Sequence, residues 1–296
     1  MLNFLPKRLV GVIALVLLAV NVLFWTSILF VFSFLKLILR RGFDRVLPWL
    51  AANWITCNGW WMKLTQKTAW NVEGLDGLNA QGWYLVVSNH QSWSDIFVLQ
   101  KLLNRRIPLM KFFLKRELIW VPFMGLAWWA LDFPFLRRHS AEYLKKHPEQ
   151  RGKDFKTTRE ACAKFSRVPT SVMNFLEGTR FSKAKHLAQG GPYRHLLKPK
   201  AGGIALAMGV LGEKFHSLLN VTIAYPDGAP TFWGFMCGRV RRVMVRVSSV
   251  EIPEHLLGGD YEGDKTFQSN FQKWVQELWQ EKDAQLDGLL REAETA

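Results

Sequence analysis

The stretch VVSNHQSWSDIFVL, residues 86–99, places a histidine and a carboxylate where one local pattern gives way to another. A strand-like run ends at Asn89, His90 follows at once, and a second apolar run begins at Asp95. Five residues of one helix turn the chain through about 500°, so two helical side chains at this spacing would point apart. We therefore place His90 in a turn and predict Ser92 as N-cap and Asp95 as N3 of a helix, with the imidazole within reach of the carboxylate.

This pattern also has a purely structural explanation, because Ser-x-x-Asp is a capping box and a histidine after a strand is commonly structural. Around it the chain alternates between strand-like and helix-like runs, which predicts an α/β sheet with helices on its faces. The expected strands are residues 82–89, 170–176, 219–225 and 242–250, and the expected helices are residues 94–103, 153–166 and 203–211. Apolar residues at helical spacing also predict a docked C-terminal helix over 265–291, with a membrane-surface helix as the alternative.

The N-terminus carries LVGVIALVLLAVNVLFWTSILFVFSFL, residues 9–35, without a charged residue. About 20 apolar residues are enough to cross a bilayer. A second aromatic stretch, residues 46–61, is expected to return as an interfacial helix, so a spanning helix and a half-buried helical hairpin both remain open. More basic residues follow the apolar run than precede it, which places the main domain in the cytoplasm. We expect an anchor over 1–70 and a globular domain over 71–296.

Charge and composition point to a partner rich in phosphate. The net charge is +15, the sequence pI is about 9.9, and the chain is 49% hydrophobic with 14 Trp. This combination favours an anionic phospholipid surface over nucleic acid, because no known nucleic-acid-binding motif is present. Cys57, Cys162 and Cys237 lie far apart without a CxxC pair, which indicates neither a disulfide framework nor a zinc site, and a reducing compartment is the default.

Two further stretches bring basic and small residues to the ends of predicted elements. NFLEGTRFS, residues 174–182, follows a strand, at the edge where ligands of open α/β sheets gather. FLKRELIWVPFMG, residues 113–125, and FPFLRRHS, residues 133–140, contribute Lys115 and Arg138 around an apolar segment. Taken singly, each stretch is explained equally well by a solvated turn or a charged surface.

The set NHxxxxD, KxxLxWxPxxG, FLRR and FxEGTR, in this order behind an apolar N-terminus, resembles the PlsC-type glycerolipid acyltransferases over residues 83–226. The whole chain is similar to the YihG-type bacterial branch of that family. Two residues depart from the family pattern. Leu176 stands where a proline usually precedes the glutamate, and Arg137 stands where an acidic residue usually precedes the arginine.

The resemblance implies a mixed sheet flanked by helices, with a catalytic domain behind a hydrophobic membrane helix or helical hairpin. It implies that His90 is the general base and that Asp95 orients its ring, while backbone N–H groups after His90 or at the next helix N-terminus stabilise the oxyanion. Arg138, Lys115 and Arg180 would bind the acceptor phosphate. The substrate-binding candidates are Asn89, Lys115, Arg138, Glu177, Gly178, Thr179, Arg180 and Lys200.

The implied reaction is acyl transfer from acyl-CoA or acyl carrier protein to lysophosphatidic acid or another lysophospholipid. The expected setting is the bacterial inner membrane, with the catalytic domain on the cytoplasmic side. No GxSxG elbow is present, which favours direct transfer, and without HExxH, paired cysteines or a Walker A pattern no metal or cofactor is expected. A hydrolase using the same pair and a non-catalytic lipid-binding membrane protein are the alternatives.

Overall fold

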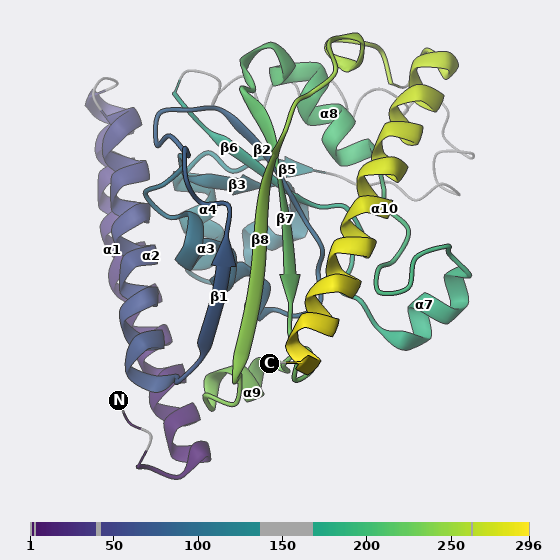
Figure 1. Cartoon of the computed structure of the whole chain (residues 1–296). Coiled ribbons are helices and arrows are strands. Elements are labelled where there is room, and N and C mark those ends of the chain that lie inside the picture. Colours follow the sequence, from purple (N-terminus) through teal and green to yellow (C-terminus); the bar gives the residue numbers. More distant parts are fainter. Residues whose placement is uncertain (1, 3, 40–42, 137–167, 262, 296) are drawn as a thin grey trace.

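A six-stranded sheet forms the centre of the protein (Figure 1). The structure, a computed structural model, describes residues 2, 4–39, 43–136, 168–261 and 263–295. The strands run in the order β1-β8-β7-β2-β6-β3. Neighbouring strands pair in parallel, except that β7 and β8 are antiparallel, so the mixed sheet flanked by helices is confirmed. The strands are β1 (Ala69–Glu73), β2 (Tyr84–Ser88), β3 (Met110–Phe112), β6 (Ser171–Phe175), β7 (Ser217–Ala224) and β8 (Arg242–Val250).

Strand β2 is buried along its whole length, and its alternating side chains enter two different cores. Leu85 and Val87 pack with α8 (Gly202–Leu211) and α10 (Lys265–Thr295) on one face of the sheet. Tyr84 and Val86 pack with α3 (Ser94–Leu103) on the other. An apolar run without a polar face therefore marks the central strand, since both of its faces are covered.

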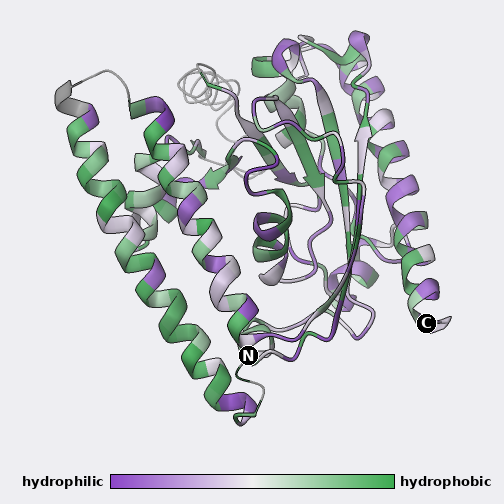
Figure 2. Cartoon of the chain, turned by 60° about the vertical axis from the view of Figure 1, so that its left-hand side comes forward, coloured by the Kyte–Doolittle hydropathy of each residue, from purple (hydrophilic) through white to green (hydrophobic). Residues whose placement is uncertain are grey.

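The N-terminal segments form a helical hairpin beside the sheet. Helix α1 (Lys7–Leu39) lies along α2 (Phe43–Thr65), and Asn21 on α1 donates a 2.8 Å hydrogen bond to Asn58 Oδ1 on α2. Trp61 of α2 packs in the same core as α3. Within α1, residues 7–36 are long and apolar enough to cross a membrane, and few of their side chains are buried. The ribbon of this helix is mostly hydrophobic and lies at the outer edge of the molecule (Figure 2). Both the spanning and the half-buried arrangement are compatible with this helix.

Shorter elements link these layers. They are β4 (Leu114–Lys115), η1 (Arg116–Trp120), α4 (Met124–Ala130), β5 (Phe135–Leu136), α7 (Lys183–Gln189), η3 (Gly212–Lys214), α9 (Phe232–Met236) and η4 (Glu254–Leu256). The predicted helix over 153–166 lies outside the described residues. The docked C-terminal helix is confirmed, because Phe271, Val275 and Trp279 of α10 are buried. Strand β1 begins two residues before the expected domain boundary, and the division into 1–70 and 71–296 stays a prediction.

Candidate active site

The carboxyl ends of β2 and β6 bring the two main sequence motifs together. In the parallel register Ser88 is paired with Phe175, so the residues that follow both strands leave the same edge of the sheet. His90 lies in the turn after β2, and Glu177 lies in the turn after β6. The Glu177 carboxylate accepts a 2.8 Å hydrogen bond from the His90 backbone N–H. This is the edge at which open α/β sheets bind their ligands.

The Asn89 side chain joins the start of the turn to the neighbouring strand β7 through two hydrogen bonds. Its side-chain amide donates to Ile223 O at 2.8 Å and accepts from Ile223 N–H at 2.9 Å. The residue is fully buried. Both ends of the amide are thus engaged by main chain, which gives Asn89 a structural position behind the site, whereas the sequence suggested a substrate-binding one.

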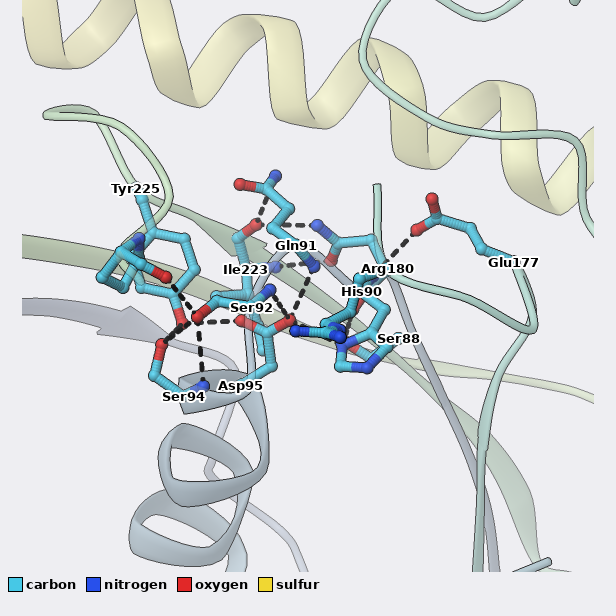
Figure 3. Close-up of polar contacts among 12 residues, drawn as sticks. Ser88, His90, Gln91, Ser92, Ser94, Asp95, Glu177, Arg180, Ile223 and Tyr225 are labelled. Carbon is cyan, nitrogen blue, oxygen red and sulfur yellow. Dashed lines mark hydrogen bonds and ion pairs between the residues drawn. The ribbon is translucent and has the colours of Figure 1, made fainter. Parts of the chain in front are cut away.

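His90 and Asp95 form the pair that the spacing predicts. His90 Nδ1 lies 2.9 Å from Asp95 Oδ2 (Figure 3). The same oxygen accepts the backbone N–H groups of Gln91 at 2.6 Å and Ser92 at 2.8 Å. Asp95 Oδ1 accepts a 2.6 Å hydrogen bond from the Tyr225 hydroxyl. Four donors therefore fix a fully buried carboxylate, and this carboxylate orients the imidazole.

Two details of this turn differ from the prediction. Helix α3 begins at Ser94 with Trp93 as N-cap, because Ser92 Oγ accepts the Ser94 N–H at 3.2 Å instead of the Asp95 N–H. Of the two hydrogen bonds of the expected capping box, only the one from the Ser92 N–H to the Asp95 carboxylate is formed. In addition, the N–H groups of Gln91 and Ser92 are both bonded to Asp95. The expectation that the amides directly after His90 form an oxyanion hole is therefore wrong for these two.

One face of the imidazole is covered by an aromatic ring. Phe175 stacks on His90 with ring centroids 3.9 Å apart and an interplanar angle of 12°. The His90 side chain is 13% exposed. Because Nδ1 is held by Asp95, Nε2 is the ring nitrogen left for a reacting group, and with the Nδ1 hydrogen donated to Asp95 it carries a free lone pair.

Glu177 is buried behind the histidine and bonds only to main chain among the contacts described. One oxygen accepts the His90 N–H, and the other accepts the Leu197 N–H at 3.2 Å. Burial raises the pKa of Glu177 to about 7, although both N–H groups and the charge of Lys282 lower it. Glu177 therefore supports the His90 main chain from behind, a contact between motifs that the sequence did not predict.

The remaining residues of the EGTR turn lie at the surface. Gly178 has φ +65°, a conformation that favours glycine, and a Cβ there would lie 3.1 Å from Lys200 Cδ. Thr179 Oγ1 accepts a 2.7 Å hydrogen bond from Lys185. The exposed Arg180 guanidinium lies 4.8 Å from the centre of the Trp93 ring. Lys200 thus lies beside this turn, and its role in substrate binding stays a prediction.

Among the described contacts, none places Lys115, another basic candidate, at His90. Lys115 is exposed at the end of β4, where it pairs with Leu136 of β5. Arg138 and Arg137 lie outside the described residues. No group of three or more His, Cys, Asp or Glu suited to a metal ion occurs in the part of the chain that the structure describes.

Three site residues escaped the sequence analysis: Phe175, Tyr225 and Lys282. Phe175 lies two residues before Glu177 and begins the FxEGTR motif, and Tyr225 ends the predicted strand 219–225, so both were within segments already singled out. Their positions at the carboxyl ends of β6 and β7 were a usable signal. Lys282 lies at helical spacing between Leu278 and Leu286 on the apolar side of α10, and this position was a usable signal of its burial.

Comparison with known proteins identifies the family of the chain. Residues 69–224, more than half of the chain, match the protein family described as Acyltransferase. Bovine 1-acyl-sn-glycerol-3-phosphate acyltransferase delta is 27% identical over 220 residues, which cover 68% of this chain and 51% of that protein. The Arabidopsis thaliana 1-acyl-sn-glycerol-3-phosphate acyltransferase 3 is 25% identical over 308 residues, covering 97% of this chain and 74% of that protein. The chain thus spans about half the length of the mammalian relative.

The fold has a solved counterpart. The crystal structure of PlsC, the lysophosphatidic acid acyltransferase of Thermotoga maritima, superposes with a TM-score of 0.53 and covers 91% of this chain and 95% of its own. At 20% identity this similarity establishes the fold. With the family match over five of the six strands of the sheet and both motif-bearing turns, the conclusion is that the chain belongs to the acyltransferase family.

Proposed function

We propose that this protein transfers a fatty acyl group from a thioester to the free hydroxyl of lysophosphatidic acid, in the synthesis or remodelling of phospholipids. The observation that carries the proposal is the His90–Asp95 pair, 2.9 Å apart at the carboxyl end of β2. The names of the relatives support the acceptor, since each is a 1-acyl-sn-glycerol-3-phosphate acyltransferase. The proposal includes membership of the YihG-type bacterial branch, which rests on the resemblance of the sequence alone.

The proposed step is direct transfer. His90 Nε2 takes the proton from the acceptor hydroxyl as its oxygen attacks the thioester carbonyl carbon. Asp95 stabilises the resulting imidazolium through the Nδ1 hydrogen. When the tetrahedral intermediate collapses, the C–S bond breaks and the thiolate leaves with the proton from His90. The products are the new ester and the free thiol, so the step needs no oxidant or metal.

The acceptor phosphate is assigned to the basic residues around the EGTR turn. Arg180 is exposed beside Trp93, and Lys200 reaches the same turn along Gly178. A guanidinium presents a planar pair of donors that matches two phosphate oxygens. Lys115 and Arg138 complete the proposed set on the basis of the motif resemblance. The donor is acyl-CoA or acyl carrier protein, and no further cofactor is proposed.

The protein is proposed to act at a membrane, through α1 and the adjoining segment 116–130. One side of α1 exposes a row of apolar side chains, among them Val12, Val16 and Val20. Helix α4 packs Ala127 in one core with Leu29 of α1, while its exposed side, its N-cap residue and η1 carry exposed apolar side chains. These are Trp120, Phe123, Leu126 and Trp129. Aromatic residues of this kind favour the lipid–water boundary. The basic residues after α1 support a cytoplasmic position at the bacterial inner membrane.

The test is product analysis by mass spectrometry. Purified full-length protein is incubated with a panel of lysophospholipids and both donor types, and with monoacylglycerol as an acceptor without phosphate. The proposal expects phosphatidic acid from lysophosphatidic acid. Transfer to a different lysolipid alone would change the acceptor, free fatty acid would indicate a hydrolase, and binding without any product would indicate a lipid-binding protein.

A further inference from the structure

The Arg180 guanidinium is held by an aromatic ring. Its Cζ lies 4.8 Å from the centre of the Trp93 ring. Among the residues that the structure describes, no carboxylate pairs with Arg180 and no acceptor binds its guanidinium hydrogens. A cation over a ring needs no hydrogen-bond acceptor, so the N–H donors of Arg180 stay available for the oxygens of an anion.

The main chain at Arg180 is fixed relative to His90 by hydrogen bonds on both sides. The His90 N–H donates to the Glu177 carboxylate at 2.8 Å, and the His90 carbonyl accepts the Phe181 N–H at 2.7 Å. In addition, Lys185 Nζ donates to the Arg180 carbonyl at 3.0 Å. The point from which the Arg180 side chain leaves the main chain is therefore set with respect to the histidine.

Trp93 belongs to the same turn as His90, three residues further along the chain. It is 51% exposed, whereas its neighbours Ser92 and Ser94 are buried. Trp93 is the N-cap residue of α3 but makes no side-chain cap hydrogen bond. Among the described residues, the printed contact of its ring is the one with Arg180. A large side chain left half in water contributes little to the core, so its presence in this turn needs another explanation.

The physical advantage of such a ring lies in the freedom of the arginine. A long exposed side chain loses rotamer freedom when it binds a ligand, and this loss weakens the binding. A flat aromatic face restricts the guanidinium beforehand, because the cation is attracted to the ring and stacks on it. Since Trp93 and His90 lie in one turn, the ring also places this cation relative to the proposed base.

We propose that Trp93 is a positioning residue for Arg180, which it holds where the guanidinium binds the phosphate of the acceptor beside His90. This role rests on the proposed function, because the phosphate is that of lysophosphatidic acid. The contact between Trp93 and Arg180 does not depend on that function. The two parts of the inference are therefore tested separately, one by kinetics and one by NMR without substrate.

The kinetic test uses Trp93→Leu, which keeps an apolar side chain without a ring, and Trp93→Phe, which keeps a smaller ring. In Trp93→Leu the KM for lysophosphatidic acid should rise about three- to tenfold, the scale of restricting one long side chain. Its kcat should stay unchanged, because the phosphate is bound equally before and during the reaction. Trp93→Phe should recover most of the loss, since a phenyl ring also attracts a cation.

The dependence on Arg180 is tested by combining substitutions. In an Arg180→Ala background, Trp93→Leu should not raise KM further, because no guanidinium remains to be held. The matched control is Trp83→Leu, at the opposite end of β2, where Lys214 lies 5.1 Å from the centre of the Trp83 ring. This substitution also removes a tryptophan that contacts a cation, and it should leave KM unchanged.

The contact itself is measured by NMR of full-length protein labelled with ¹⁵N-tryptophan. The indole signal of Trp93 is assigned by its loss in Trp93→Phe. Without substrate, this signal should shift in Arg180→Ala and stay in place in Arg241→Ala, on an exposed arginine. Adding glycerol 3-phosphate, the head of the acceptor without its acyl chain, should move the signal in the wild type and not in Arg180→Ala.

An unchanged Trp93 signal in Arg180→Ala would overturn the contact. A rise in KM that is equal with and without Arg180 would overturn the positioning role, since Trp93 would then act by another route, such as contact with the lipid chain. So would a loss confined to kcat, which would place its effect on His90. If the signal shifts in Arg180→Ala while the wild type transfers no acyl group, the contact stands and the proposed function fails.

Discussion

Replacing Asp95 by asparagine separates the charge of this carboxylate from its shape. Three donors converge on Oδ2, from His90, Gln91 and Ser92, at 2.9, 2.6 and 2.8 Å. The asparagine oxygen must therefore occupy this position. Its NH₂ group then faces the Tyr225 hydroxyl, which can turn and accept. Every hydrogen bond has a substitute, so the turn should keep its conformation.

The loss should appear in catalysis. A neutral amide does not stabilise the imidazolium that forms when His90 takes the proton. In the Ser-His-Asp triad the same change costs about 10⁴-fold in kcat. We expect a fall of roughly 10³- to 10⁴-fold here, which is about 4 to 5.5 kcal/mol of transition-state stabilisation. The cost in stability should be smaller, about 1 to 3 kcal/mol, because charge-assisted hydrogen bonds become neutral ones.

The assay is the initial rate of phosphatidic acid formation, with thermal unfolding measured in the same detergent. Tyr225→Phe is the matched comparison, because it removes the 2.6 Å bond to Oδ1 and leaves the Oδ2–His90 bond intact. Its kcat should fall only about tenfold, the value of one hydrogen bond to a charged group. A folded Asp95→Asn variant with kcat within tenfold of the wild type would refute the assigned role of Asp95.

Three further predictions address the acceptor, the buried carboxylate and the membrane. Arg180→Ala should weaken transfer to lysophosphatidic acid by roughly 1.5 to 3 kcal/mol and transfer to monoacylglycerol much less. Arg241→Ala, on an exposed arginine, is the control and should leave the acceptor preference unchanged. Equal losses with the two acceptors in Arg180→Ala would remove Arg180 from the phosphate site. Because the pKa of Glu177 is raised in the folded protein, this group contributes stability that is complete below about pH 4.5 and is lost as the pH rises through about 7. The free energy of unfolding should therefore fall by at most about 3 kcal/mol over this pH range. An equal fall in Glu177→Gln would contradict this assignment. Val16→Asp with Val20→Asp, both on the exposed side of α1, should shift the protein from the membrane pellet to the soluble fraction with unchanged unfolding temperature, and retention in the pellet would place the anchor elsewhere.

The sequence predicted those elements whose pattern is local. The apolar runs of β2, β6, β7 and β8 and the periodicity of α3 and α10 are determined by burial within each element, and these predictions are confirmed. Strand β1 and the three-residue β3 were not predicted. Both are edge strands, defined by pairing with β8 and β6, partners far away in the sequence.

In the site, too, the contacts between residues close in sequence were predicted and those between distant segments were not. His90 and Asp95 are five residues apart, so turn geometry alone was enough to predict their contact. The contacts of Glu177 with His90, of Tyr225 with Asp95 and of Lys282 with β7 each join segments more than 50 residues apart. They depend on strand order and register, which a single sequence does not specify. The roles of Lys115 and Arg138 stay predictions.

The central claim is that His90 is the base for acyl transfer, and His90→Ala tests it most directly. Single-turnover formation of phosphatidic acid from lysophosphatidic acid and an acyl thioester would be measured by mass spectrometry, on protein whose membrane extraction and unfolding temperature match the wild type. The account predicts a loss of at least about 10²- to 10⁴-fold, the usual contribution of a general base. Turnover close to that of the wild type in folded His90→Ala would contradict it.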